Sequence, residues 1–298
     1  MSIMIFTVEK ACDFLYKFPI GAITNSFCCD YKTAIKRAAS IGVDGIQTYA
    51  AFGDVRPIDL NVAERKELLS LVKNNGLVFS AMCGDYGLEY WKQEQHHLII
   101  EKMKGVIELA RDLETNIITT HLGVIPSESE HERYKILQDI CFRLAEYAQS
   151  SDVFFAIETG PEPASVLKGF IDSLNSKRIA VNLDPANLVM SLKEDPVEAV
   201  YTLKNYIVHT HAKDGIFYSM IPPEYDYGIF PMPEEYKNVV SYEEVPLGEG
   251  QVDFKRYLAA LEEIGYKGFL TIEREVGDNP SNDIKKAFDY LRNIIESN

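Results

Sequence analysis

Four side chains that can bind metal ions or carry protons end four apolar stretches in the second half of the chain. The stretches VFFAIE, IAVNLD, YIVHTH and GFLTIE end at Glu158, Asp184, His211 and Glu273. Carboxylates and an imidazole together are suitable ligands for a divalent cation. We therefore expect one divalent metal ion (Mn, Co, Zn or Mg) and proton transfer on an oxygenated substrate.

The spacing of these residues indicates how the chain brings them together. They are 26, 27 and 62 residues apart, and the first two intervals have the length of one strand-plus-helix unit. If consecutive parallel strands lie side by side, their carboxyl ends meet at one rim. The four side chains are then expected to converge there.

Eight short apolar runs bounded by turn residues provide the strands for such a rim. They cover residues 19–23, 45–49, 77–83, 116–121, 153–158, 179–184, 206–211 and 268–273. Helical spacing of apolar residues lies between them, for example over 103–113, 254–261 and 284–291. Eight strand-helix repeats predict an α/β fold, a (β/α)8 TIM barrel, as one domain over residues 1–298. The GxGxxG fingerprint of an open dinucleotide-binding sheet is missing after the first run.

Two stretches interrupt the regular repeat. Residues 215–250 follow the seventh predicted strand and are rich in tyrosine and proline. Because active sites of barrels form on that side, we expect a lid or pocket wall, with an inert insertion or an oligomer contact as the alternative. Residues 50–61, with Phe52 and Arg56, receive no assignment from the sequence.

The composition narrows the possible partners and the compartment. The formal charge of -15, from 45 acidic and 30 basic residues, disfavours nucleic acid and anionic membranes as partners. No apolar run of about 18 residues and no signal segment within MSIMIFTVEKACDF are present, so a cytoplasmic protein is expected. The five cysteines, at 12, 28, 29, 83 and 141, contain no CxxC and are expected to be reduced and structural.

Each of the four residues also has an ordinary structural explanation. Glu158 could form a salt bridge, because a carboxylate buried unpaired would cost several kcal/mol. Asp184 precedes Pro185, a common start for a helix. Glu273 precedes Arg274 and Glu275 and could belong to a surface charge cluster.

The histidines extend the pattern. His209 and His211 are two residues apart and therefore point to the same face of their strand, with His211 nearer the rim and His209 in a supporting or packed position. His121 closes the fourth predicted strand and could be a substrate contact or a hydrogen-bonded structural histidine. Five of the eight predicted strands thus end in a metal-binding group, which favours a shared site over coincidence.

Several motifs resemble one known family. They are THLGVIP (120–126), AIETGPEP (156–163), VNLDPANL (181–188), VHTHAKDG (208–215), VPLGEGQVDF (245–254) and LTIERE (270–275). The chain is similar to the sugar phosphate isomerase/epimerase group of xylose-isomerase-like TIM barrels. This group includes ketose 3-epimerases, hydroxypyruvate isomerases, inosose dehydratases and, more distantly, endonuclease IV. The resemblance implies that Glu158, Asp184, His211 and Glu273 bind the metal.

The chain departs from this family pattern at two places. Endonuclease IV and many epimerases have a histidine where this chain has Asn187, and the Asp-x-His of endonuclease IV is Tyr242-Glu243-Glu244 here. A three-zinc phosphodiesterase site would therefore lack ligands. Together with the acidic composition, this argues against action on DNA.

The resemblance and the paired glutamates imply a mechanism. Glu158 and Glu273 are expected to be catalytic: one abstracts a proton next to a carbonyl, and the other returns it, by way of a metal-stabilised enediolate. Return to the same carbon is epimerisation, and return to the adjacent carbon is isomerisation. The alternatives are a metal-dependent dehydratase of a keto-sugar or keto-inositol, and a non-catalytic sugar-binding barrel.

The expected partner is a small sugar or sugar phosphate, and a homo-oligomer is compatible with the sequence. Candidates to bind the hydroxyl groups or a phosphate of the substrate are His121, Asn187, His209, Lys213, Gln47 and Glu162, with Asp214 as a further one.

Overall fold

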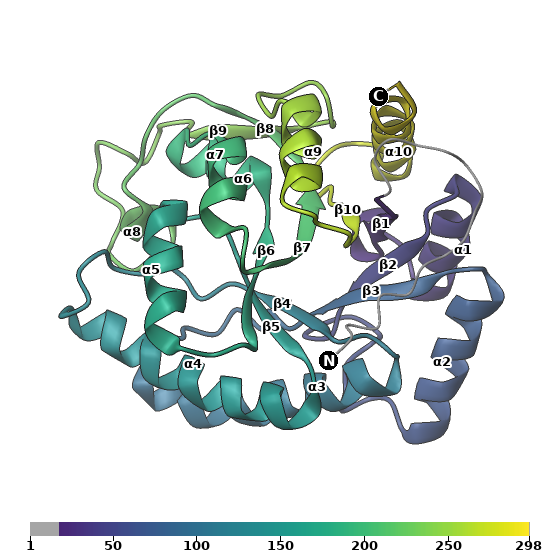
Figure 1. Cartoon of the computed structure of the whole chain (residues 1–298), viewed down its shortest axis with the longest axis horizontal. Helices are drawn as coiled ribbons and strands as arrows, with labels where there is room; N and C mark the ends of the chain where they lie inside the picture. Colours follow the sequence, from purple (N-terminus) through teal and green to yellow (C-terminus); the bar gives the residue numbers. More distant parts are fainter. Residues whose placement is uncertain (1–17, 298) are drawn as a thin grey trace.

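Eight parallel strands form a closed barrel in the computed structural model, which describes residues 18–297 (Figure 1). Around the barrel their order is β1-β10-β7-β6-β5-β4-β3-β2. Their bounds are Ile20–Ile23 (β1), Gly45–Tyr49 (β2), Val78–Cys83 (β3), Ile117–Thr120 (β4), Phe154–Glu158 (β5), Ile179–Leu183 (β6), Ile207–Ala212 (β7) and Leu270–Ile272 (β10). Each strand lies within its predicted run, except that β7 extends one residue beyond it, so the expected TIM barrel is confirmed. The predicted absence of a signal segment and Cys12 concern residues outside the described part.

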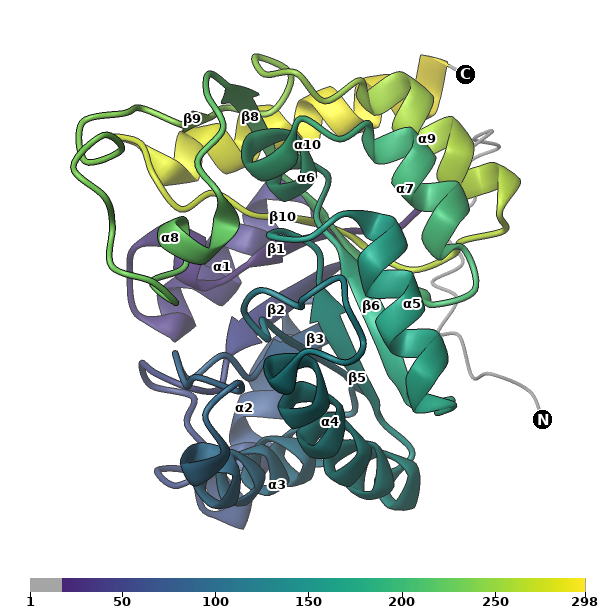
Figure 2. The ribbon, with the colours of Figure 1, turned by 90° about the vertical axis from the view of Figure 1, so that its left-hand side faces the viewer.

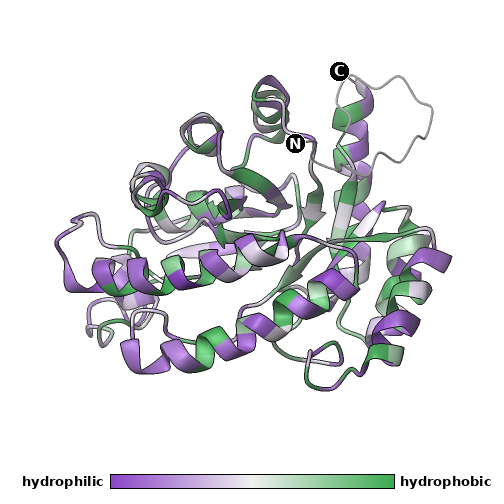
Figure 3. Ribbon diagram, turned by 60° about the horizontal axis from the view of Figure 1, so that its bottom comes forward, coloured by the Kyte–Doolittle hydropathy of each residue, from purple (hydrophilic) through white to green (hydrophobic). Residues whose placement is uncertain are grey.

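Helices surround the barrel on its outer face (Figures 1 and 2). Their bounds are Tyr31–Ile41 (α1), Val62–Asn74 (α2), His96–Asp112 (α3), Glu132–Ser151 (α4), Ala164–Leu174 (α5), Pro185–Leu192 (α6), Pro196–Leu203 (α7), Phe254–Glu263 (α9) and Pro280–Ser297 (α10). The three helical stretches named from spacing lie in α3, α9 and α10. Hydrophobic residues predominate in the central strands, whereas hydrophobic and hydrophilic residues alternate along the outer helices (Figure 3).

The strands are apolar because both of their faces are covered. All five residues of β6 are buried, and its side chains pack alternately against the barrel interior and the helices. The apolar character stops at the carboxyl ends of the strands, where the polar residues identified from the sequence stand. The fold therefore concentrates chemistry at one rim.

Register fixes which of these polar residues become neighbours. Glu158 of β5 pairs with Asn182 of β6, and His211 of β7 pairs with Thr271 of β10. The β1 and β10 strands pair in parallel from Ile20 and Leu270 onward, which closes the barrel. The β10 strand also pairs with β7, which sets Glu273 next to the other members of the rim.

The insertion at 215–250 contains a small sheet that the sequence did not indicate. The β8 strand (Asp214–Phe217) pairs antiparallel with β9 (Tyr242–Val245), and the short helix α8 (Pro223–Asp226) lies between them in the chain. The β8 strand packs against α6, as Figures 1 and 2 also show. The insertion leads from β7 to α9, which is the position expected from the sequence.

Two sequence expectations concern the whole chain. The four cysteines within residues 18–297, namely Cys28, Cys29, Cys83 and Cys141, are all free thiols, in agreement with the expectation of reduced cysteines. Over the same residues, every helix is too short or too polar to span a bilayer.

Candidate metal centre and active site

Glu158, Asp184, His211 and Glu273 converge at the carboxyl end of the barrel. Glu158 is the last residue of β5, while Asp184 and Glu273 directly follow β6 and β10. The β7 strand continues one residue beyond its predicted end, so that His211 is its penultimate residue. One potential ligand atom from each residue lies within 4.8 Å of all the others, and all four residues are buried.

The imidazole of His211 is at the centre of this cluster. Its Nδ1 lies 3.4 Å from Glu158 Oε1, 3.4 Å from Asp184 Oδ2 and 3.2 Å from Glu273 Oε2. Despite this proximity, His211 Nδ1 and Asp184 Oδ2 are buried without a hydrogen-bond partner. Ligand atoms about 2.0–2.2 Å from one metal ion are typically about 3–3.5 Å apart. The donor set and its spacing therefore fit a divalent cation.

Neighbouring amides hold two of these ligands in place. Asn182 Nδ2 donates to Glu158 Oε2 at 3.0 Å, and Asn187 Nδ2 donates to Glu158 Oε1 at 3.1 Å. Gln47 Nε2 donates to Thr119, which leaves Gln47 Oε1 as an acceptor 3.2 Å from His211 Nε2. His211 Nε2 also lies 3.2 Å from Asn182 Nδ2, so both amides hold the ring with Nδ1 turned toward the carboxylates. Burial alone would lower the pKa of His211, but these carboxylates raise it, and a cation bound at Nδ1 would take the place of that proton.

Asp184 combines the two roles that the sequence left open. Its Oδ1 accepts from the backbone N–H groups of Ala186 and Asn187 at 2.8 and 3.0 Å and thereby caps α6. Its Oδ2 points to His211. Burial raises the pKa of Asp184, although His211 and Lys213 oppose that shift. A bound cation would compensate this buried charge.

Glu273 lies beside a buried lysine. Lys213 Nζ donates to Glu273 Oε2 at 3.2 Å and also binds Glu275. Burial alone would raise the pKa of Glu273, but Lys213 and His211 outweigh it and lower the pKa to about 2. Glu273 is therefore buried and ionised, in contrast to the exposed charge cluster that was its alternative explanation.

His121 adjoins the cluster and has a partner that the sequence did not indicate. Its Nδ1 is 2.9 Å from Asp85 Oδ2, and its Nε2 is 3.4 Å from Glu158 Oε1. Burial alone would raise the pKa of Glu158, but His121 and His211 hold the pKa well below its usual range. Asp85 follows β3, and its position after an apolar run was the available signal.

The remaining predicted substrate contacts lie in different surroundings. His209 is fully buried below His211, and its Nε2 lies 3.0 Å from Gln47 Oε1, which corresponds to a supporting position. Glu162 is buried near Ile125 N at 3.4 Å, and burial raises the pKa of its carboxyl to about 8. Asn182, which the sequence analysis missed, is fully buried between Glu158 and His209 in register.

Asp214 has a structural environment in place of the substrate contact considered from the sequence. Its carboxylate accepts from the backbone N–H groups of Gly215, Gly248, Gly250 and Val252 at 2.9–3.1 Å. These bonds fasten the end of the insertion to β8. The tight approach requires glycine at 250, where a Cβ would lie 2.1 Å from Asp214 Oδ1.

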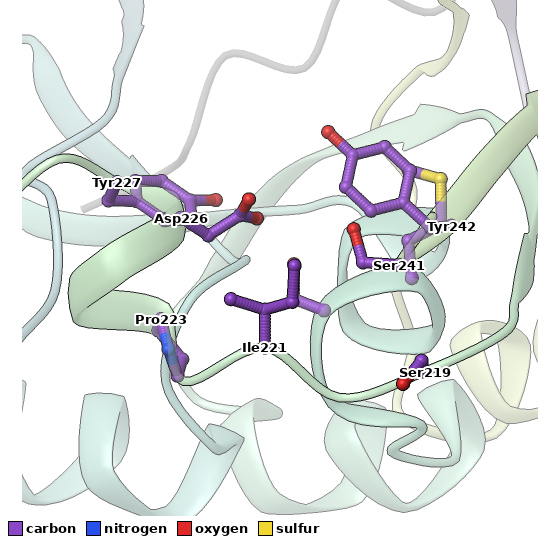
Figure 4. A pocket seen from close by; sticks show the side chains of 9 residues that line it. Ser219, Ile221, Pro223, Asp226, Tyr227, Ser241 and Tyr242 are labelled. Carbon is purple, nitrogen blue, oxygen red and sulfur yellow. The ribbon is translucent and has the colours of Figure 1, made fainter. Parts of the chain in front are cut away.

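The insertion reaches the site through Tyr227, one of the tyrosines of the stretch for which the sequence predicted a lid or pocket wall. Its hydroxyl lies close to Gly160: a Cβ added to Gly160 would be 3.1 Å from the Tyr227 hydroxyl oxygen. Burial, followed by Glu162 and Glu158, raises the pKa of Tyr227. A shallow crevice separates Tyr227 and Asp226 from Ser241 and Tyr242, with Ile221 between the two sides (Figure 4).

Comparison with known proteins finds relatives along most of the chain. The model of the xylose isomerase-like TIM barrel family matches residues 35–294. The L-ribulose-5-phosphate 3-epimerases UlaE of Salmonella paratyphi A and Escherichia coli are 24% identical to this chain over 271 residues, covering 87% of this chain and 87% of theirs.

Solved structures show the same fold. A xylose isomerase domain protein from Planctomyces limnophilus superposes with a TM-score of 0.75 and 22% identity, covering 94% of this chain and 97% of that one. A xylose isomerase-like TIM barrel protein from Mycobacterium smegmatis, in complex with magnesium, has a TM-score of 0.69 and 15% identity, with coverage of 94% and 97%.

Proposed function

This chain belongs to the xylose isomerase-like TIM barrel family, and we propose that it is a divalent-metal-dependent sugar isomerase or epimerase. Relatives named as epimerases support an enzyme of this class. The observation that carries the proposal is the buried cluster in which three carboxylates surround His211 Nδ1 at 3.2–3.4 Å.

Glu158, Asp184, His211 and Glu273 would hold the cation. When bound, a divalent cation supplies a Lewis acid that polarises the carbonyl oxygen of the substrate. Gln47 fixes the ring of His211, and Asn182 and Asn187 fix the carboxylate of Glu158. Such outer partners keep the donor atoms in position before the substrate arrives.

Glu158 and Glu273 carry the proton transfer in this proposal. They stand on β5 and beyond β10, which are separated in the barrel by β6 and β7. This separation suits two groups that approach a substrate carbon from different sides. The lowered pKa of each carboxyl keeps both ionised, so that either can accept a proton from the carbon next to the carbonyl.

The surrounding polar groups provide contacts for hydroxyl groups. Asn187 and His121 touch Glu158 directly, and Lys213 touches Glu273, so these three would lie beside a substrate held between the glutamates. Glu162 and Tyr227 form the adjoining wall. The insertion would shield the reacting atoms from water, in the wall role expected from the sequence.

Solvent exchange tests this proposal. The protein loaded with Mn, Co, Zn or Mg is incubated in D₂O with a panel of ketoses, and deuterium at the carbon next to the carbonyl is followed by NMR. We expect exchange together with formation of an epimer or isomer. Loss of water from the substrate would instead identify a dehydratase.

A variant of the proposed base completes the test. Because general acid-base catalysis contributes roughly 10²–10⁴-fold, Glu158→Gln should lower kcat at least 100-fold while the metal is retained. Glu263→Gln is the matched control, since Glu263 is exposed and accepts a hydrogen bond from the hydroxyl of Tyr201 at the protein surface. Wild-type turnover by metal-loaded Glu158→Gln would refute the role of Glu158.

A further inference from the structure

We infer that the substrate of this site is an uncharged sugar or related hydroxy ketone, and that its phosphate ester is a poor substrate. This inference rests on the proposed function and specifies its substrate class. Its basis is that carboxylates of the chain already bind most of the cations and backbone amides at this rim that could hold a phosphate.

Buried cations are the first such groups. Within residues 18–297, the buried lysines and arginines are Arg178, Lys213 and Arg274. Arg178 precedes β6, at the other end of the barrel, and pairs with Asp152. The two at the site are saturated with carboxylates: Lys213 has Glu273, Glu275 and Glu244 as partners, and Arg274 has Glu244 and Asp283.

Two arginines nearer the surface of the rim also have carboxylate neighbours. Arg56, in the stretch after β2 that the sequence left unassigned, binds Asp59. Arg133, at the start of α4, has one terminal nitrogen 3.5 Å from Glu224 beside α8, while its buried Nη1 has no hydrogen-bond partner. A phosphate would have to displace Asp59 from Arg56, and at Arg133 it would meet the charge of the neighbouring Glu224.

Backbone amides are the second kind of phosphate ligand, and the loops after the seventh and eighth strands of a TIM barrel often supply them. Here the seventh strand is β7. The backbone N–H groups of Gly248, Gly250 and Val252, at the end of the insertion, bind the carboxylate of Asp214, and so does the N–H of Gly215. The eighth strand is β10, and the N–H of Glu275 after it binds Glu244 Oε1 at 3.0 Å. Internal anions thus occupy both positions.

The N-terminal amides of the helices after β5 and β6 also bind carboxylates of the chain. The first amide of α5, at Ala164, binds both carboxylate oxygens of Glu194 at 3.2 and 3.1 Å. The first amides of α6 bind Asp184. Helix N-termini attract anions, but these two have their anion within the chain.

The charges that remain in the pocket are acidic. Buried Glu158, Asp184 and Glu273 surround the reacting position. A phosphate monoester would add a charge of about -1.5 to -2 to this enclosure. A neutral polyol avoids that repulsion and can hydrogen-bond to carboxylates and to the amide of Asn187.

Matched substrate pairs test the inference. Solvent exchange is measured for L-ribulose and L-ribulose 5-phosphate, D-fructose and D-fructose 6-phosphate, and D-tagatose and D-tagatose 6-phosphate, with the metal-loaded protein. We expect kcat/KM for the better neutral sugar to exceed that of its ester by about tenfold or more. An ester used as well as its sugar would overturn the inference and leave the proposed function intact. Exchange with no member of any pair would refute the proposed function itself.

A charge variant adds a local control. Glu275→Gln removes one partner of Lys213, and its side chain is 55% exposed, so the fold should be kept. We expect the kcat/KM for the ester, divided by the kcat/KM for the sugar, to rise about threefold or more. Glu234→Gln removes an equal charge from an exposed ion pair with Lys237 in the insertion and should leave the ratio unchanged. Equal ratios in both variants would contradict the role given to Lys213.

Discussion

Replacing Asp184 by asparagine separates helix capping from metal binding. Asparagine retains an oxygen that can accept from the N–H groups of Ala186 and Asn187, so the start of α6 should be kept. The substitution removes the charge of Oδ2, which faces His211 Nδ1 without a hydrogen bond. The variant should therefore fold normally and bind the cation weakly.

The magnitude follows from ligand-linked stability. With the metal at 1,000 times its Kd, the wild-type protein gains about 4 kcal/mol in free energy of unfolding. If the variant binds about 100-fold more weakly, it gains about 1.4 kcal/mol, and the difference of about 2.7 kcal/mol lowers its Tm by about 5 °C. Without metal we expect the variant to be the more stable protein, because burial disfavours the ionised carboxylate of Asp184 and raises its pKa despite His211 and Lys213.

The assay is thermal unfolding of both proteins after chelation and after reconstitution, with metal content measured in parallel. Asp195→Asn is the matched control, because Asp195 also precedes a proline and caps α7, but it lies outside the metal cluster. Equal metal-induced Tm shifts for wild type and Asp184→Asn would refute Asp184 as a ligand. A less stable variant without metal would mean that the charge of Asp184 supports the fold.

Two further predictions concern the electrostatics and the packing around the site. Burial raises the pKa of Glu162 to about 8 from 4.5, so the folded state holds this proton and loses stability as pH rises from about 4.5 through 8. Glu162→Gln should therefore raise the free energy of unfolding at pH 9, by at most about 5 kcal/mol, and have little effect at pH 4.5. Denaturant unfolding at both pH values measures the free energy of unfolding. An equal effect of the substitution at both pH values would exclude a buried, protonated Glu162 as its cause. Gly250→Ala should cost about 2 kcal/mol or more, because the new Cβ collides with Asp214, whereas Gly169→Ala in α5 meets open space and should stabilise by about 0.5–1 kcal/mol. Equal denaturation midpoints for the two alanine variants would contradict the close approach at Gly250.

Local sequence patterns were sufficient for the barrel and for the cluster at its rim. Strands buried on both faces need continuous apolar runs, and each run that ended in Glu158, Asp184 or Glu273 located a strand end to within one residue. Parallel strands in a closed barrel must bring those ends together, so convergence followed from order and spacing. His211 was placed by the alternation of side chains along β7, which depends only on the chain itself.

The partners of these residues depended on the tertiary structure. Gln47 reaches His211 across 164 residues of chain, and Asp85 meets His121 only because β3 and β4 are paired. The sheet of β8 and β9 was missed because its pairing depends on the anchor at Asp214, which no local pattern reports.

Sequence by itself therefore determined the fold class and the four residues that gather at the rim. It also indicated Lys213 as a candidate to bind hydroxyl groups or a phosphate, whereas it gave the turn at 248–250 no such role. Only the folded chain decided that carboxylates already occupy them, because whether a charge is free depends on neighbours that are distant in sequence and adjacent in space.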